Sequence, residues 1–189
     1  MIGWFVTWLG RWLALGFELA GALIRGVLGG LAGGTGGGAA GGVAPQVRRA
    51  GAAEVVDLRH LVLRAGLPRS TAVFAGDDAP STRHWVAEVG GRVVGVVTVL
   101  ASPAPEGAPS PAGFQLRGMA VSPDHRGSHL GEALLLAAQR DVAAPMWCNA
   151  RVGVVPFYAK YGWQAYGPTF EVEHAGAHQR MGWSPAQAR

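Results

Sequence analysis

The sequence predicts a single α/β (α+β) domain over residues 46–187, preceded by an apolar, glycine-rich extension over residues 1–45. Three observations support this prediction. From Gln46 onward, apolar residues alternate between helical and strand spacing. Gly90-Gly91 separates two strand-like runs, which is typical of a two-residue hairpin turn. A chain of 189 residues has room for one ordinary domain and a tail, but not for two large lobes.

The extension divides into a helix-like part and a linker. Over residues 1–28 the pattern is that of an apolar helix, with Arg11, Glu18 and Arg25 recurring every seven residues on one face. Its uncharged runs are shorter than the roughly 20 residues of a membrane-spanning helix. Three interpretations stay open: an interfacial membrane or partner-docking helix, an over-extended chain start, and a membrane anchor. Residues 29–42 have the composition of a flexible linker.

The first half of the domain contains one helix and three strands. A short strand over 46–49 precedes a helix over 52–65, which Gly66-Leu67-Pro68 ends. Strands over 84–89 and 92–100 flank the glycine pair. The second of these is apolar on both faces, so we expect it at the centre of a sheet.

The second half begins with a loop over 101–113, because this segment holds four prolines and no apolar run. The spacing then predicts, in order, a strand over 114–121, a turn over 122–128, a helix over 129–141, a strand over 146–150, a short helix over 154–161, and strands near 163–173 and 178–183.

The start of the helix after residue 128 has the features of an anion site. A helix start leaves backbone N–H groups unpaired and carries the positive end of the helix dipole. Gly127 and Gly131 let an anion approach the main chain, and Arg126 adds a positive charge. Residues 126–131 therefore predict a phosphate cradle, with a plain strand-to-helix turn as the alternative.

This stretch resembles the acetyl-coenzyme A motif of the GNAT superfamily of N-acetyltransferases, an Arg/Gln-x-x-Gly-x-Gly/Ala pattern that follows a strand. Arg126 and Gly131 match the pattern, and His129 stands where it has its middle glycine. Asn149-Ala150-Arg151 and the run over 156–163, PFYAKYGW, are similar to the second signature of that superfamily. The two signatures occur in the expected order, and the resemblance covers about residues 46–183.

The resemblance implies a fold and an activity. The fold is a mixed, mostly antiparallel sheet flanked by helices, in which the strand over 114–121 splays from the strand over 146–150. The activity is transfer of an acetyl group from acetyl-CoA to a primary amine, by direct attack in a ternary complex. The acceptor would be a small molecule or a peptide.

The resemblance also implies site residues. Tyr158 would be the general acid that protonates the leaving thiolate. The implied coenzyme A contacts are Met119, Ala120, Val121, Arg126, Gly127, Ser128, His129, Leu130, Gly131, Glu132 and Asn149. Because His129 brings a β-carbon to the phosphate site, we expect it to weaken coenzyme A binding.

Other residues stay open or are set aside. The candidates for the general base are His60, His84, His178, Glu171 and Glu173. Arg59 and Arg64 could line an acceptor site for an acidic substrate, or lie on a solvated helix face. We expect Cys148 to be a small buried hydrophobe and not a nucleophile.

Charge and cysteine content limit the partners. The formal charge of +4 is spread over scattered basic residues, so we expect no nucleic-acid partner. A single cysteine excludes an internal disulfide and a cysteine-built zinc site, and it favours a reducing cytoplasm. We expect no metal, and membrane contact only through residues 1–28; a homodimer stays open. Two alternative functions remain, a non-catalytic acyl-CoA-binding module and a membrane-associated scaffold.

Overall fold

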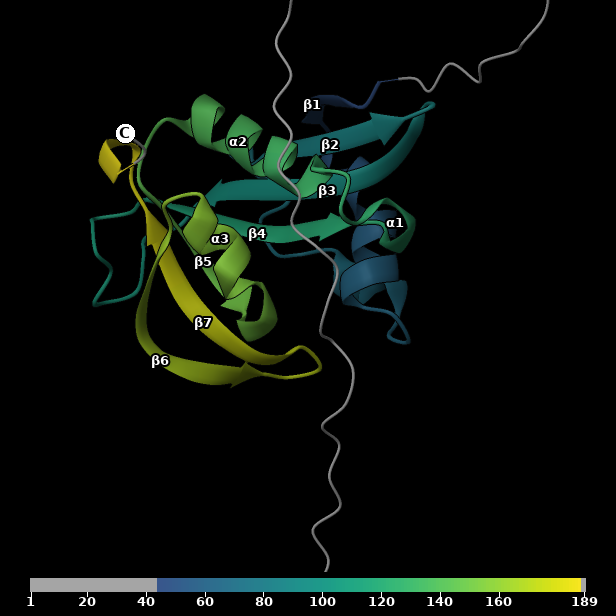
Figure 1. The fold of residues 1–189 in the computed structure, drawn as a ribbon. Helices are drawn as coiled ribbons and strands as arrows, with labels where there is room; N and C mark the ends of the chain where they lie inside the picture. The colour runs from purple at the N-terminus through teal and green to yellow at the C-terminus, as the bar shows by residue number, and fades with distance from the viewer. Residues whose placement is uncertain (1–43, 188–189) are drawn as a thin grey trace, which may run out of the picture. The chain divides into compact units, whose positions relative to one another are not determined.

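The computed structural model describes residues 44–187, so the helix expected over residues 1–28 and the linker over 29–42 lie outside the described residues. The described chain forms one seven-stranded sheet in the order β1-β2-β3-β4-β5-β7-β6 (Figure 1). Its strands are β1 (Gln46–Ala50), β2 (Arg83–Val89), β3 (Arg92–Ala101), β4 (Phe114–Val121), β5 (Met146–Arg151), β6 (Gln164–Val172) and β7 (Gly176–Trp183). Among these seven described strands only β4 and β5 pair in parallel, so the predicted mixed, mostly antiparallel sheet is confirmed.

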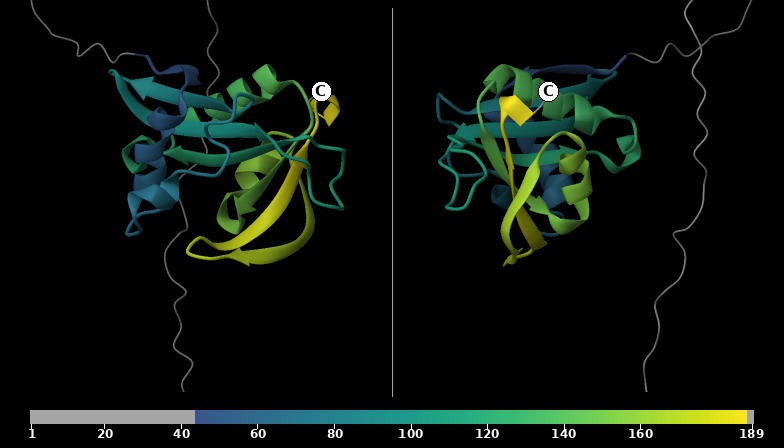
Figure 2. Two further views of the ribbon diagram at one scale, coloured as in Figure 1. Left: turned by 180° about the vertical axis from the view of Figure 1, so that it is seen from behind. Right: turned by 60° about the vertical axis from the view of Figure 1, so that its left-hand side comes forward.

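Within the described residues, three α-helices accompany the sheet, namely α1 (Ala52–Leu63), α2 (Leu130–Val142) and α3 (Val155–Lys160). Helix α1 covers one face, and α2 and α3 cover the other (Figures 1 and 2). Within residues 44–187, no helix has the length and apolar character needed to cross a membrane.

The strand pattern explains why helices cover both faces. On β2, Trp85 and Ala87 belong to the core beneath α2, whereas Val86 belongs to the core beneath α1. On β3, Val97 and Val96 divide between the same two cores. Alternate residues of a strand point to opposite faces, so a strand that is apolar on both faces must lie between two layers. The predicted central position of β3 is confirmed.

The ends of the elements follow local chemistry. The side chain of Glu54 accepts the Gly51 N–H at 2.8 Å, which caps the start of α1. Helix α1 ends at Leu63, two residues before the predicted end. In the β2–β3 turn, Gly90 and Gly91 both have positive φ, as the predicted two-residue hairpin requires.

The sheet opens between β4 and β5. These strands pair only where Phe114–Leu116 lie beside Met146–Cys148. Beyond Leu116, β4 continues on β3 up to Val121, while β5 continues on β7 up to Arg151. The two strands therefore part on the side that carries the α2 turn, and the predicted splay is confirmed.

A bulge shapes the open end of β4. The register with β3 shifts between Val96 and Thr98, opposite Gly118 and Met119. Gly118 has φ of 58°, and a β-carbon there would lie 2.6 Å from Nε of Arg59. A larger residue would be strained and would clash, so glycine allows both the bulge and the close approach of the arginine.

Candidate active site

Two cavities meet at the open end of β4. The first, of about 450 Å³, lies between β4, the start of α2, and α3. The second, of about 580 Å³, is lined by α1, β4, β5 and the β6–β7 hairpin. Both are lined by Met119, Ala120, Val121, Arg126, Val154 and Tyr158. A ligand in the first cavity and a ligand in the second would therefore contact each other at the split between β4 and β5.

The start of α2 forms one wall of the first cavity. Among residues 44–187, no backbone carbonyl or side chain accepts a hydrogen bond from the N–H groups of Gly127–Glu132. Gly127, Gly131 and Glu132 line the cavity together with Arg126, while Ser128 lies outside its lining. Unpaired N–H groups at a helix start, beside an arginine, make a site for an anion. This geometry is compatible with the predicted phosphate cradle, which stays a prediction.

His129 takes a backbone conformation that favours glycine. Its φ of 62° and ψ of 7° lie in the left-handed region, which costs a residue with a β-carbon about 1–2 kcal/mol. The side chain is 80% exposed, and its Nδ1 donates to Glu132 at 3.0 Å. This hydrogen bond is the main cause that lowers the pKa of Glu132. The imidazole therefore lies at the rim of the anion site, with its partner carboxylate also lining the cavity.

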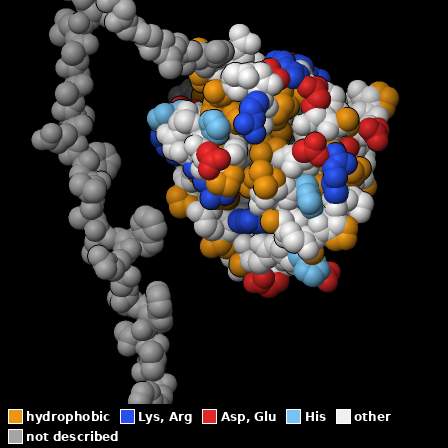
Figure 3. Space-filling view, turned by 90° about the vertical axis from the view of Figure 1, so that its right-hand side faces the viewer, with side chains coloured by type: hydrophobic (Ala, Val, Ile, Leu, Met, Phe, Trp, Pro, Cys, Tyr) orange, Lys and Arg blue, Asp and Glu red, His pale blue; other side chains and the backbone are white. Residues whose placement is uncertain are grey.

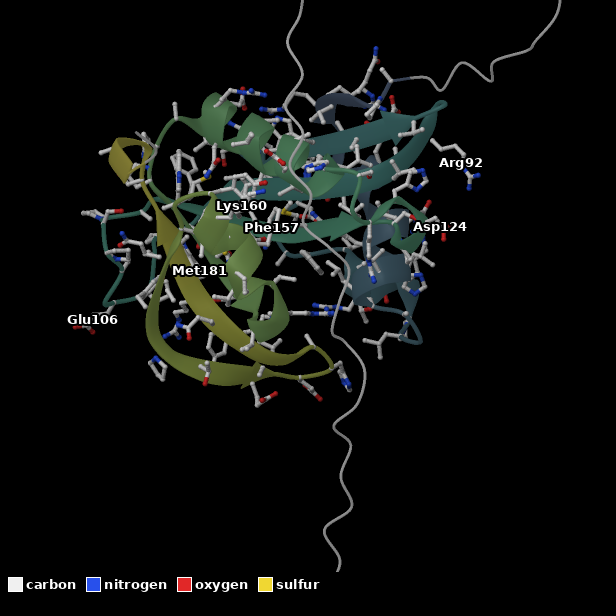
Figure 4. All side chains as sticks on the ribbon, viewed as in Figure 1. Arg92, Glu106, Asp124, Phe157, Lys160 and Met181 are labelled. Atoms are coloured by element: carbon white, nitrogen blue, oxygen red, sulfur yellow. The ribbon has the colours of Figure 1, made fainter. Side chains whose placement is uncertain are left out.

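Five residues that line the first cavity were not predicted from the sequence as site residues: His125, Val154, Phe157, Lys160 and Tyr161. Three of them lie on or just after α3 at positions i, i+3 and i+4, so they share one face of the helix. Phe157 and Lys160 lie where α3 approaches β4 and α2 (Figure 4). The helical spacing within PFYAKYGW was the signal that could have found them.

Tyr158 lies in the wall that the two cavities share. Its ring makes edge contacts with Phe157 and Trp163 at centroid distances of 5.3 and 5.4 Å. Its hydroxyl lies 3.5 Å from Sδ of Met119 on β4. Burial raises the pKa of Tyr158 well above its ordinary value, so the hydroxyl keeps its proton at neutral pH. The side chain can therefore donate a proton at the split.

The second cavity is lined mainly by side chains from distant parts of the chain. Asn149 and Arg151 of β5 line it beyond the last β4–β5 pair, and Arg64 follows the end of α1. Asn149 lines the second cavity and not the first. Figure 3 shows one face of the domain, on which basic, histidine and acidic side chains all lie among hydrophobic ones.

Of the five candidates for the general base, only His178 lines either cavity. Its Nδ1 lies 2.7 Å from the carbonyl oxygen of Gly176. A carbonyl oxygen only accepts, so Nδ1 carries the proton and the neutral ring has its free electron pair on Nε2.

The other four candidates are placed differently. Both ring nitrogens of His84 are in contact with buried partners, Thr98 and the Asp77 carbonyl. Nε2 of His60 lies 2.7 Å from the Leu67 carbonyl. Glu171 lies on β6 and Glu173 in the β6–β7 turn, and both side chains are exposed and outside both cavities.

The expectation for Arg59 was wrong in both of its forms. Arg59 is fully buried and bonds to Asp77 at 2.5 Å, with Thr98 as a further hydrogen-bond partner. Arg117 joins the same carboxylate at 3.0 Å. A buried guanidinium requires such partners, so Arg59 lies neither on a solvated face nor on the wall of an acceptor site. Arg64 does line the second cavity.

Asp77 keeps its charge within this cluster. Burial by itself raises the pKa of Asp77, but hydrogen bonds from Arg59 and the Phe74 N–H, with the charges of Arg59 and Arg117, bring it below the ordinary value. The Phe74 ring lies 4.5 Å from Cζ of Arg59 and 5.5 Å from Cζ of Arg117. The cluster thus fixes Phe74 and Arg117 in the wall of the second cavity.

Cys148 has the character that the sequence predicted. It is 1% exposed, and burial raises the pKa of its thiol. A protonated, buried thiol is a poor nucleophile. Within residues 44–187, no three His, Cys, Asp or Glu side chains gather in a way that could hold a metal ion.

Comparisons with known proteins agree on one family. Residues 80–165 match the family model described as acetyltransferase (GNAT) domain. The chain is 28% identical to a Bacillus subtilis protein named uncharacterized N-acetyltransferase YitI, over 70% of this chain and 91% of that protein.

Solved structures share the fold. One, named as histone acetyltransferase HPA2 and related acetyltransferase from Corynebacterium glutamicum, has a TM-score of 0.62 at 18% identity, over 75% of this chain and 96% of that one. Escherichia coli ElaA has a TM-score of 0.60 at 15% identity, over 74% and 99%. An aminoglycoside 6'-N-acetyltransferase complexed with coenzyme A has a TM-score of 0.56 at 12% identity, over 73% and 96%.

Proposed function

We propose, from the premise that the chain is a GNAT-type acetyltransferase, that it transfers an acetyl group from acetyl-CoA to a primary amine. One observation carries this proposal: the free N–H groups of Gly127–Glu132 stand beside Arg126 in a cavity that reaches the split between β4 and β5. The amine would be a small molecule or a peptide and would enter through the second cavity. The cytoplasm is the proposed compartment.

The residues present fit coenzyme A in the first cavity. Its diphosphate carries negative charge, which the N–H groups after Arg126 and the Arg126 side chain would hold. Its pantetheine arm has amide groups, and Met119–Val121 offer a strand edge that β5 leaves unpaired. An extended amide chain can pair with such an edge as an added strand would. The remaining proposed contacts are His129 and Leu130 in the first cavity, Ser128 next to it in the chain, and Asn149, which lines the second cavity.

Bound acetyl-CoA supplies a thioester, whose carbonyl carbon forms a bond to the amine nitrogen as its bond to sulfur breaks. Backbone N–H groups near Met119 or Ala120 would polarise that carbonyl. Tyr158 would then give its proton to the leaving sulfur, because its hydroxyl is protonated and lies at the shared wall. The burial of Cys148 supports direct transfer without a covalent acyl-enzyme.

An amine must lose a proton when it attacks. We assign this proton to Nε2 of His178, either directly or through one water. The support for His178 is its place in the lining of the second cavity, together with the tautomer that Gly176 selects.

The test measures binding and turnover on the full chain. We expect calorimetry to show heat when coenzyme A is added, and a thiol-release assay to show acetyl-CoA consumption that depends on an amine. His178→Gln should lower the rate without changing coenzyme A affinity, and His60→Gln is its matched control. An absence of coenzyme A binding would end the proposal. Binding without turnover across a wide amine panel would favour the alternative, a non-catalytic acyl-CoA-binding module.

A further inference from the structure

We propose that the second cavity selects amines that also carry an anionic group, a carboxylate or a phosphate. This inference rests on the proposed function and names its substrate class. Its first support is the charge of the lining. The charged side chains that line the cavity, apart from the titratable His178, are Arg64, Arg117, Arg126 and Arg151, and none of the lining side chains is acidic.

The arginines are not neutralised by neighbours. Arg64, Arg126 and Arg151 form no ion pair within residues 44–187. Arg117 pairs with Asp77, but that carboxylate also serves the buried Arg59. One negative charge therefore faces two positive ones, and the cavity keeps a positive excess even where it contains an ion pair.

Two of these arginines, Arg64 and Arg117, are also held in place by the Phe74 ring. Cζ of Arg64 lies 5.4 Å and Cζ of Arg117 lies 5.5 Å from the centre of the Phe74 ring. Nη1 of Arg64 donates to the Leu63 carbonyl at 3.0 Å, which fixes the guanidinium further. A guanidinium fixed on an aromatic ring loses less entropy when it binds, and its planar fork suits carboxylate and phosphate oxygens.

The same lining disfavours acceptors with several positive charges. Such amines need carboxylates around them, and the lining of this cavity provides none. We therefore do not expect this cavity to favour a polycationic acceptor such as an aminoglycoside, although the fold is similar to that of an aminoglycoside 6'-N-acetyltransferase. An amine with its own anionic group would place that group toward Arg64, Arg117 and Arg151 and its nitrogen toward the split.

The experiment compares matched pairs on the full chain. In the turnover arm, thiol release from acetyl-CoA is measured with L-phenylalanine against L-phenylalaninamide, and with O-phosphoethanolamine against ethanolamine. The first pair tests a carboxylate and the second a phosphate, with kanamycin as the polycationic reference. The amide has the less basic and so more readily deprotonated amine, and this bias opposes the inference. We expect kcat/KM to be about tenfold higher for the amine with an anionic group than for its partner without that group.

A binding arm separates this inference from the proposed function. N-acetyl-L-phenylalanine, its amide, and the phosphate-bearing N-acetyl-O-phosphoethanolamine are titrated calorimetrically into the chain with coenzyme A present. We expect at least one anionic compound to bind about tenfold more tightly than the amide, whether or not turnover is seen. Arg64→Gln and Arg151→Gln should each weaken that binding and leave coenzyme A affinity unchanged. Arg92→Gln is the control, because Arg92 lies in the β2–β3 hairpin outside both cavities (Figure 4).

The outcomes are distinct. Equal binding of the acids and the amide, or a preference for kanamycin over the anionic amines, overturns the inference while leaving acetyl transfer intact. A loss of coenzyme A heat overturns the proposed function, and the comparison of acid with amide still decides the charge preference of the second cavity. Unchanged binding in both Arg64→Gln and Arg151→Gln also rejects the assignment.

Discussion

The two cavities on either side of the β4 end are built in different ways. Most of the lining of the first comes from one stretch of the chain, between Met119 and Glu132, and one face of α3 completes it. The second combines β4 with residues from distant parts of the chain, namely α1, the segment before β2, β5 and the β6–β7 hairpin. A site formed by one stretch of the chain can be recognised as a sequence motif, whereas a site formed by distant side chains cannot.

The difference also concerns what each cavity depends on. The first needs a helix start, a glycine-like turn and an arginine, and most of its side chains could change without loss of the N–H groups. The second depends on the buried cluster of Arg59, Asp77 and Arg117 that positions Phe74. Substitutions within that cluster should therefore act through fold stability, whereas substitutions at the start of α2 should act through ligand affinity.

The largest effect is expected at Asp77. Asp77→Asn removes the charge that serves Arg59 and leaves a buried guanidinium without its counterion. Breaking a buried pair in this way costs about 3–5 kcal/mol of the free energy of unfolding, which chemical denaturation measures. Asp78→Asn is the matched control, since Asp78 is exposed and should change stability by less than about 0.5 kcal/mol. A loss of similar size in both variants would refute the role of the cluster.

The difference in unfolding free energy between the wild type and Asp77→Asn should depend on pH. The folded pKa of Asp77 lies below its unfolded value, so its contribution to stability is present above about pH 4. That contribution is lost as the pH falls through the folded pKa, because the folded state must then take up the proton. The gap in unfolding free energy between the wild type and Asp77→Asn should therefore narrow below about pH 4. A gap that stays constant from pH 6 to pH 3 would contradict this assignment.

An intermediate effect is expected at Tyr158, which both cavities share. Tyr158→Phe keeps the ring contacts and removes the proton donor, so we expect kcat to fall by about 100-fold or more. Coenzyme A affinity should stay within a factor of about two, as calorimetry can check. Tyr166→Phe is the control, because the Tyr166 hydroxyl is buried without a hydrogen-bond partner and lies outside both cavities. Equal kcat in the wild type and Tyr158→Phe would remove the acid role.

The smallest effect is expected at His129. His129→Gly relieves the strain at φ of 62°, but glycine also raises the entropy of the unfolded chain, so stability should rise by less than about 1 kcal/mol. Without a β-carbon at the anion site, coenzyme A should bind about three- to tenfold more tightly. His129→Ala removes the imidazole but keeps the β-carbon, so its affinity should stay near that of the wild type. A gain of equal size in both variants would assign the effect to the imidazole.

The sequence predicted the sheet well, and most of the residues that it assigned to coenzyme A binding line the first cavity, for a physical reason. The β4 bounds and the glycine hairpin depend on nearest neighbours in the chain, and the α2 turn follows a contiguous motif. The burial of Arg59 could not be read from the sequence, because it depends on Asp77, a residue 18 positions away in a segment without regular spacing. The choice of His178 among five candidates likewise required the β6–β7 hairpin to fold against β5.

The most direct test of the account follows the backbone amide signals of the full chain by NMR while coenzyme A is added. The account predicts that the amides of Gly127–Glu132 shift strongly and together, because their N–H groups have no hydrogen-bond partner within residues 44–187. The amides of Met119–Val121 should also shift, because these residues line the first cavity where β4 no longer pairs with β5. The amides of Arg92 and of the loop around Glu106, which lie away from both cavities (Figure 4), should stay in place. Coenzyme A binding that leaves the Gly127–Glu132 signals unmoved would contradict the central claim.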